Sequence, residues 1–383
     1  MFRFRDKIIY IISPENWGAM KVSKHHYAMA LADRGNRVFF IEPPRLTYQG
    51  VSLLDCPDHA QITLVRYRPL FRGRKYIPEG IYQLLIRWQV RRLLSAINAL
   101  PDAVICFHGY LFEDLRLFRA PVRIFFAADQ FYYDHIPPET RTASLNVGVS
   151  DTICDRIRKE GVTVQQINHG LHHRLVEIAK HRLQAGYRTA AIDPGKVVVG
   201  FTGNLRMEAL DRDTMRAVIE AHPEVQFVCW GSYRAGDLNL GGLKTEAADE
   251  FVAFLEARPN VQLRGVVDHE TLHREMDAVD IFWLCWKLGT HRLWDGSNSH
   301  KLLEYLSTGR PVVSHHVSAY RGNTLLYMQP GLSNEGYAGL FNRVLDIVRQ
   351  GEAALHVRAR LEFAVANGYD ARLQELEEWI SHG

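Results

Sequence analysis

The chain has 383 residues, of which 47% are hydrophobic and 23% are charged, and its formal net charge at pH 7 is +3. These values are typical of a globular protein with a sizeable core and two domains. So small a net charge gives no support for nucleic acid as a partner, and we expect none.

The five cysteines are widely spaced and include no Cys-x-x-Cys pair, which fits a reducing compartment. The first apolar run, residues 7–13, stops at Pro14 and is too short for a membrane span. It therefore predicts a first core strand and not a signal peptide. We expect a cytoplasmic protein.

Apolar runs in the first half of the chain predict the strands of a parallel sheet covered by helices. Residues 7–42 form a β-α-β unit with a helix at 22–34, which is typical of a Rossmann half. The loop after its first strand lacks a complete Gly-x-Gly-x-x-Gly, so we predict no dinucleotide cofactor. Further strands are predicted at 103–107, 122–127, 145–150 and 164–167.

Two polar residues follow predicted strands of the first half. His108 comes directly after strand 103–107, and Asp129 comes shortly after strand 122–127. Ligands of open α/β sheets bind beyond the carboxyl ends of the strands, so both side chains are candidates for a cleft. Asp129 could orient a hydroxyl group or act as a base, although capping of the next turn explains it almost as well. For His108 the alternative is a local hydrogen bond to a loop carbonyl.

The segment 66–94 is strongly basic, and Glu79 is its one acidic residue. Its apolar residues from 81 onward recur at helical spacing beside arginines. A basic amphipathic helix that carries a tryptophan can lie on an anionic membrane, so peripheral contact with the inner face of the membrane is one hypothesis. The other is that Leu84, Leu85 and Trp88 pack on the sheet. The basic residues are Arg66, Arg68, Arg72, Arg74, Lys75, Arg87, Arg91 and Arg92.

A second β-α-β series begins at Lys196, after a connection at 182–195. The sequence Asp211-Arg212-Asp213 matches an Asp-x-Asp metal motif only superficially, because Asp213 is better explained as the cap of the next helix. We predict no metal site. Strands are expected within 197–204, 226–232, 260–268 and 281–285, and helices at 213–221, 269–277, 336–349, 352–365 and 371–380.

The stretch 298–314 predicts a helix, a turn and a buried strand. Asn298 and Ser299 are suitable N-caps for a helix at 300–308, and Gly309 and Pro311 stop it. Lys301 and Glu304 then share one helical face. They are either a solvated ion pair or a nucleotide site, in which Lys301 and the helix N-terminus attract a diphosphate and Glu304 accepts hydrogen bonds from ribose hydroxyls.

The run HKLLEYLSTGRPVVS at 300–314 resembles the nucleotide-sugar helix of family 4 glycosyltransferases. Residues 168–170 and 197–204 resemble that family more weakly. The resemblance implies an α/β fold of the GT-B architecture, with two Rossmann-like parallel-sheet domains facing a central cleft. It implies an acceptor-side domain at 1–185, a donor-side domain at 196–365, and a C-terminal helix at 366–383 that crosses back to the first domain.

The resemblance also implies roles for individual residues. His108, Asp129, Lys301 and Glu304 would be catalytic, and Trp17 would face the sugar or acceptor unless it only packs over the sheet. The family's first glutamate corresponds to Gly296 here, so that role falls to Asp295 or to backbone amides. The residues implied in donor binding are Trp17, Gly18, Gly203, Asn204, Arg206, Gly231, Val266, Val267, Ser297, Asn298, Ser299, His300, Lys301 and Glu304.

The function implied by the resemblance is transfer of a sugar from a UDP- or GDP-linked donor to a glycan or lipid-linked acceptor. Such a reaction would be retaining, with the leaving phosphate taking the acceptor proton, and would need neither metal nor cofactor. A nucleotide-sugar 2-epimerase on the same fold is an alternative, although the sequence suggests few histidines and acidic residues around Glu304. A binding protein that has lost catalysis is another.

Overall fold

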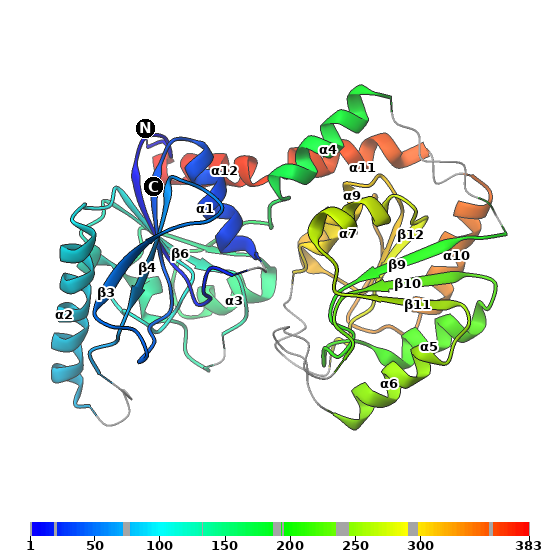
Figure 1. Cartoon of the computed structure of the whole chain (residues 1–383), viewed down its shortest axis with the longest axis horizontal. Helices are drawn as coiled ribbons and strands as arrows, with labels where there is room; N and C mark the ends of the chain where they lie inside the picture. The colour runs from blue at the N-terminus through cyan, green and yellow to red at the C-terminus, as the bar shows by residue number, and fades with distance from the viewer. Residues whose placement is uncertain are drawn as a thin grey trace. The chain divides into compact units, whose positions relative to one another are not determined.

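The computed structural model describes residues 2–18, 21–71, 77–131, 133–186, 193, 195–234, 245–289, 298–351 and 355–382. The chain forms two compact units, Met1–Gly170 with Tyr369–Gly383, and Leu171–Gly368 (Figure 1). The division after Gly170 lies earlier in the chain than the predicted boundary after residue 185. The α/β fold built on two largely parallel sheets, which the sequence predicted, is confirmed.

The first unit contains an eight-stranded sheet in the order β3-β4-β2-β1-β5-β6-β7-β8. Every neighbouring pair is parallel except β3 and β4, which are antiparallel. Ile9 to Ile12 of β1 are completely buried, as expected for a central strand with helices on both faces. The strands are β1 (Ile8–Ile12), β2 (Arg37–Ile41), β3 (Val51–Asp55), β4 (Ile62–Tyr67), β5 (Ala103–Cys106), β6 (Val122–Ala127), β7 (Leu145–Gly148) and β8 (Gln165–Gln166).

The C-terminal helix α12 belongs to the first unit, where it packs against α1. Arg34 at the end of α1 donates to Asp370 (2.9 Å), and Glu377 accepts a hydrogen bond from the backbone N–H of Phe4 (2.7 Å). The start and the end of the chain are thereby tied together. The helices of this unit are α1 (Ser23–Asp33), α2 (Glu79–Ile97), α3 (Asp151–Lys159) and α12 (Tyr369–His382), with short 3-10 turns η2 (Leu115–Phe118) and η3 (Pro138–Arg141).

The second unit contains a six-stranded, fully parallel sheet in the order β11-β10-β9-β12-β13-β14. The strands are β9 (Val198–Thr202), β10 (Gln226–Trp230), β11 (Val261–Gly265), β12 (Ile281–Leu284), β13 (Val312–Ser314) and β14 (Tyr327–Met328). The helical segments are α4 (His173–Gln184), α5 (Arg212–Ala221), α6 (Glu246–Glu256), α7 (His269–Met276), α9 (Lys301–Leu306), η4 (Ser318–Tyr320), α10 (Tyr337–Arg349) and α11 (Val357–Ala366).

Several local features differ from the sequence-based expectations. The antiparallel pair of β3 and β4 and the helix α4 were not expected. Asp211, and not Asp213, caps α5, because its carboxylate accepts a hydrogen bond from the backbone N–H of Thr214 (3.1 Å). Asp213 lies in the first turn of that helix. Over the described ranges, no helix combines the length and the apolar character needed to span a bilayer.

Candidate functional site

Three glycines lie at the carboxyl ends of adjacent strands in the second unit. Gly203 follows β9, Gly231 follows β10 and Gly265 ends β11, and all three have positive φ angles (150°, 121° and 71°). The N–H of Gly231 donates to the carbonyl of Gly265 (2.7 Å), and the N–H of Gly203 donates to that of Trp230 (2.8 Å). The ends of the three strands therefore carry no side chains, and the N–H groups of Gly203 and Gly231 are both used in hydrogen bonds between the loops.

Helix α9 is anchored over this edge of the sheet by its apolar residues. Leu302, Leu303, Tyr305 and Leu306 are fully buried. The hydroxyl of Tyr305 accepts a hydrogen bond from the backbone N–H of Thr202 at the end of β9 (2.9 Å). Its ring also stacks on Phe282 of β12, with the ring centroids 4.5 Å apart. These contacts fix the helix that carries Lys301 and Glu304.

The start of α9 differs from the prediction. The N-cap is His300, which already has helical backbone angles and makes no side-chain cap. The carbonyl of His300 accepts hydrogen bonds from the backbone N–H groups of Leu303 (3.1 Å) and Glu304 (3.3 Å). The predicted N-caps Asn298 and Ser299 precede this turn and are almost completely buried. The helix is also shorter than the predicted span of 300–308.

Lys301 extends along the glycine at the end of β9. A β-carbon built on Gly203 would lie 3.3 Å from Cε of Lys301. Lys301 is half-buried, and none of the described carboxylates lies within ion-pair distance of its ammonium group. Burial lowers the pKa of Lys301, while the nearby Glu304 opposes this shift. An anion bound here would stabilise the charged ammonium group.

The side chain of Glu304 is 29% exposed and interacts with three histidines. Nε2 of His300 lies 3.6 Å from its Oε1. Burial lowers the pKa of His273 to about 4, and it also lowers the pKa of His172, while the charge of Glu304 opposes both shifts. These rings are therefore neutral at pH 7. The expectation of few histidines near Glu304 is wrong, because α7 and the start of α4 bring two of them from distant parts of the sequence.

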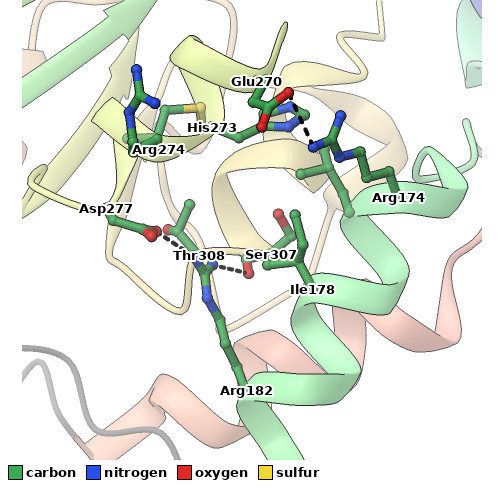
Figure 2. A pocket seen from close by; sticks show the side chains of 11 residues that line it. Arg174, Ile178, Arg182, Glu270, His273, Arg274, Asp277, Ser307 and Thr308 are labelled. Atoms are coloured by element: carbon green, nitrogen blue, oxygen red, sulfur yellow. Dashed lines mark hydrogen bonds and ion pairs between the residues drawn. The ribbon is translucent and has the colours of Figure 1, made fainter.

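A cavity of about 320 Å³ adjoins this region at the other end of α9, where Ser307 and Thr308 line it (Figure 2). Ion pairs join α4 to α7 at its rim, from Arg174 to Glu270 (3.7 Å) and from Arg182 to Asp277. Arg182 also donates to the backbone carbonyl of Ser307 (2.9 Å). The other lining residues are Leu175, Ile178, His273, Arg274 and Met276.

The remaining predicted donor residues of the second unit have varied surroundings. Arg206 is buried, and its guanidinium donates to Asp249 of α6 (2.6 Å), so it is paired within the protein. The side chain of Asn204 accepts a hydrogen bond from the backbone N–H of Arg206 (2.9 Å). Val266 is 67% exposed beyond β11, and Val267 beside it is half-buried. The predictions for Asp295, Gly296 and Ser297 concern residues outside those that the structure describes.

Four predicted residues belong to the first unit. Trp17 is buried, and its indole N–H donates to Asp58 (2.6 Å), so its ring packs within that unit. Gly18 and Asp129 are exposed. Burial lowers the pKa of His108, as does the charge of Lys24, while a backbone hydrogen bond to Ser13 opposes the shift.

Sequence reasoning missed Glu139, which organises the loop that follows His108. This carboxylate is fully buried and accepts hydrogen bonds from four consecutive backbone N–H groups, at residues 110–113, over distances of 2.9 to 3.0 Å. Tyr110 and Glu113 in this loop have positive φ angles (67° and 61°). Glu139 lies more than 25 residues after this loop in the sequence, so no local sequence pattern indicated that its side chain would bind the loop. Within the described parts of the chain, no group of three or more His, Cys, Asp or Glu residues could hold a metal ion.

No family model matches the chain, and neither does any curated protein. Solved structures do resemble it over almost its full length. HepE from Anabaena, in complex with UDP, is 14% identical and superposes with a TM-score of 0.64, covering 98% of this chain and 100% of that one. Sucrose-phosphate synthase from Thermosynechococcus elongatus is 13% identical, with a TM-score of 0.65 and 98% of each chain covered.

The catalytic domain of starch synthase IV from Arabidopsis thaliana, bound to ADP and acarbose, is 12% identical and has a TM-score of 0.64, with 99% of each chain covered. Identities this low concern the fold alone. The chain has the GT-B fold of these structures, which confirms the predicted fold class. Membership of family 4 stays a prediction.

Proposed function

We propose that this protein is a glycosyltransferase that uses a UDP- or GDP-linked sugar as donor and a glycan or lipid-linked molecule as acceptor. The observation that carries the proposal is the position of Lys301, whose side chain runs along Gly203 at the bare end of β9. The likeness in fold to a protein in complex with UDP and to another bound to ADP supports it.

The donor diphosphate would bind where the strand ends meet the start of α9. The absence of a side chain at Gly203 leaves room for Lys301, which supplies the cation. Stabilising the charge that develops on the departing diphosphate is the main requirement of sugar transfer. The residues present can meet it without a metal, so we propose a metal-independent reaction that needs no cofactor. Asn204, Asn298 and Ser299 would support this loop region.

Glu304 would accept hydrogen bonds from the hydroxyls of the donor ribose. Its partial exposure leaves the carboxylate accessible, while the neutral His172 and His273 do not compete as cations for its charge. The backbone at Val266 and Val267, at the end of β11, would lie beside the nucleobase. A site of this kind recognises the ribose and diphosphate that UDP- and GDP-linked sugars have in common, and other contacts select the base.

We also propose roles for two residues of the first unit, His108 and Asp129. A neutral His108 can exchange hydrogen bonds with a sugar hydroxyl, and the lowered pKa of this ring supports the neutral form at pH 7. Asp129 is exposed and could orient another hydroxyl. We propose retention of anomeric configuration, with the leaving phosphate accepting the proton of the acceptor. All five cysteines are free and buried, which suits the cytoplasm, where we place the reaction.

Incubation with UDP-, GDP-, ADP- and dTDP-sugars tests the proposal. We expect free nucleotide to appear with one donor when a suitable glycan or lipid-linked acceptor is added. Glu304→Ala should abolish this release, whereas Glu335→Ala, at an exposed glutamate of the same unit, should not. Conversion of the sugar without transfer would indicate the epimerase, binding without turnover would indicate a binding protein, and absence of any binding would contradict the site.

A further inference from the structure

Helix α2 has apolar residues on two opposite faces. Tyr82, Ile86, Val90 and Leu93 lie on the inward face and are buried in the first unit. A second set, spaced by three and four residues, lies on the outward face and is exposed. Its members are Ile81 (53% exposed), Leu84 (59%) and Trp88 (62%). Packing on the sheet therefore accounts for only one of the two faces, and the predicted packing of Leu84 and Trp88 on the sheet is wrong.

The neighbouring strand β3 also exposes apolar side chains. Figure 1 shows α2 on the outside of the first unit beside β3, and the two elements are in contact. Leu53 and Leu54 of β3 are 42% and 38% exposed. β3 is the edge strand of its sheet. Because successive residues of a strand point to opposite faces, only one of these two leucines can lie on the side of the sheet that α2 covers. Exposed apolar side chains that share one face, as Ile81, Leu84 and Trp88 do on α2, often mark interaction sites.

Arginines lie on the same helix as the exposed apolar residues. Arg87 and Arg91 are exposed, and Arg92 is half-buried on the same helix. In the described portion of the chain, none of the three has a carboxylate within ion-pair distance, whereas Arg66 of β4 is paired with Glu42 (2.7 Å). The predicted basic residues Arg72, Arg74 and Lys75 lie outside the described residues.

We propose that this face of α2, formed by Ile81, Leu84, Trp88, Arg87 and Arg91 and here called the α2 surface, docks onto an anionic lipid bilayer. Apolar side chains with a tryptophan enter the boundary between headgroups and acyl chains, and the arginines contact anionic headgroups. The unpaired positive charge favours a lipid surface of opposite charge over a second copy of the same basic helix. The inference does not depend on the proposed sugar transfer.

Sedimentation of the full chain with vesicles tests this docking without any nucleotide sugar. We expect binding to vesicles of phosphatidylcholine mixed with phosphatidylglycerol and little binding to phosphatidylcholine alone. Salt at about 1 M shortens the screening length to about 3 Å and should release most of the protein. Equal binding to both kinds of vesicle, or to neither, would overturn the proposal.

Variants of the α2 surface make the test specific. Replacing Ile81, Leu84 and Trp88 together by Ser should abolish sedimentation with anionic vesicles, and Arg87→Gln with Arg91→Gln should weaken it roughly fivefold for each arginine removed. The matched control is Leu355→Ser, because Leu355 is 77% exposed in the second unit. These side chains are exposed, so thermal unfolding should stay unchanged.

The original chain could instead form a dimer in solution and fail to bind vesicles. If the Ser variant were then a monomer, the α2 surface would be a contact between two copies and the proposal would be overturned. Unaltered sedimentation of the Ser variant would overturn it as well.

Discussion

A β-carbon added to Gly231 would lie 2.1 Å from the carbonyl oxygen of Gly203. The two glycines follow neighbouring parallel strands, and the loops after those strands touch through their backbones. No side chain fits between them. The close approach of the two loops beside the proposed diphosphate site therefore requires glycine at position 231.

Gly231→Ala should be strongly destabilising. The added methyl group meets backbone that cannot turn aside, and the φ angle of 121° is unfavourable for any L-residue. We expect the free energy of unfolding to fall by more than about 3 kcal/mol. Gly322→Ala is the control, because Gly322 also has a positive φ angle but no atom lies near the position of an added side chain. This substitution should lower the free energy of unfolding by only about 1 kcal/mol. Urea unfolding measures both, and equal losses would contradict the close contact.

Lys301→Met should weaken binding of the diphosphate and leave the helix in place. Methionine keeps most of the apolar stem that lies along Gly203 but removes the charge. We expect roughly tenfold to hundredfold weaker binding of UDP or GDP, the range for a hydrogen bond to a charged group, and little change for the nucleoside. Calorimetric titration measures both ligands. Lys196→Met, at an exposed lysine, should behave like the original protein, and equal weakening for nucleoside and diphosphate would argue against a phosphate contact.

Glu139→Ala should destabilise the first unit and alter the loop after His108. The substitution leaves four backbone N–H groups without their acceptor, so we expect a loss of at least about 3 kcal/mol of unfolding free energy. Glu160→Ala removes an exposed ion pair with Arg141 and should cost less than about 1 kcal/mol. Chemical unfolding of the two variants compares them directly, and similar small losses would refute the structural role of Glu139.

Stability should fall between pH 6.5 and pH 4 because of His25. Burial lowers the pKa of His25 to about 4, and its Nδ1 accepts a hydrogen bond from the N–H of Val22 (3.1 Å), so the folded ring is neutral. The unfolded chain binds a proton in this window that the folded chain does not, so acid favours unfolding. We expect His25 to contribute a loss of about 2 to 3 kcal/mol. His25→Gln should make the dependence of unfolding free energy on pH shallower, and an unchanged slope would contradict this.

Much of the fold could be predicted because parallel strands buried on both faces are continuous apolar runs. The strands β1, β9 and β12 are examples. The antiparallel pair of β3 and β4 was missed because β3 lies at the edge of the sheet and exposes three of its five residues. Helix α4 was missed because charged residues and histidines dominate it, and only Leu175, Val176 and Ala179 are buried.

The candidate site could be predicted only in part, because its geometry depends on contacts between distant residues. The resemblance to family 4 glycosyltransferases identified Gly203 and Gly231, and helical spacing paired Lys301 with Glu304. Spacing could not reveal that Arg206 is paired with Asp249. Nor could it reveal the histidines beside Glu304, since tertiary packing alone brings them there.

Binding of nucleotides to Glu304→Ala tests the central claim most directly. Calorimetric titration measures four affinities. The original protein and the variant are each titrated with UDP or GDP, and with an analogue of that nucleotide that lacks the ribose hydroxyls. We predict that the original protein loses roughly tenfold to hundredfold affinity for the analogue, while the variant binds both ligands equally weakly. If Glu304→Ala binds the nucleotide as tightly as the original protein, or distinguishes the two ligands just as strongly, Glu304 does not hold the ribose.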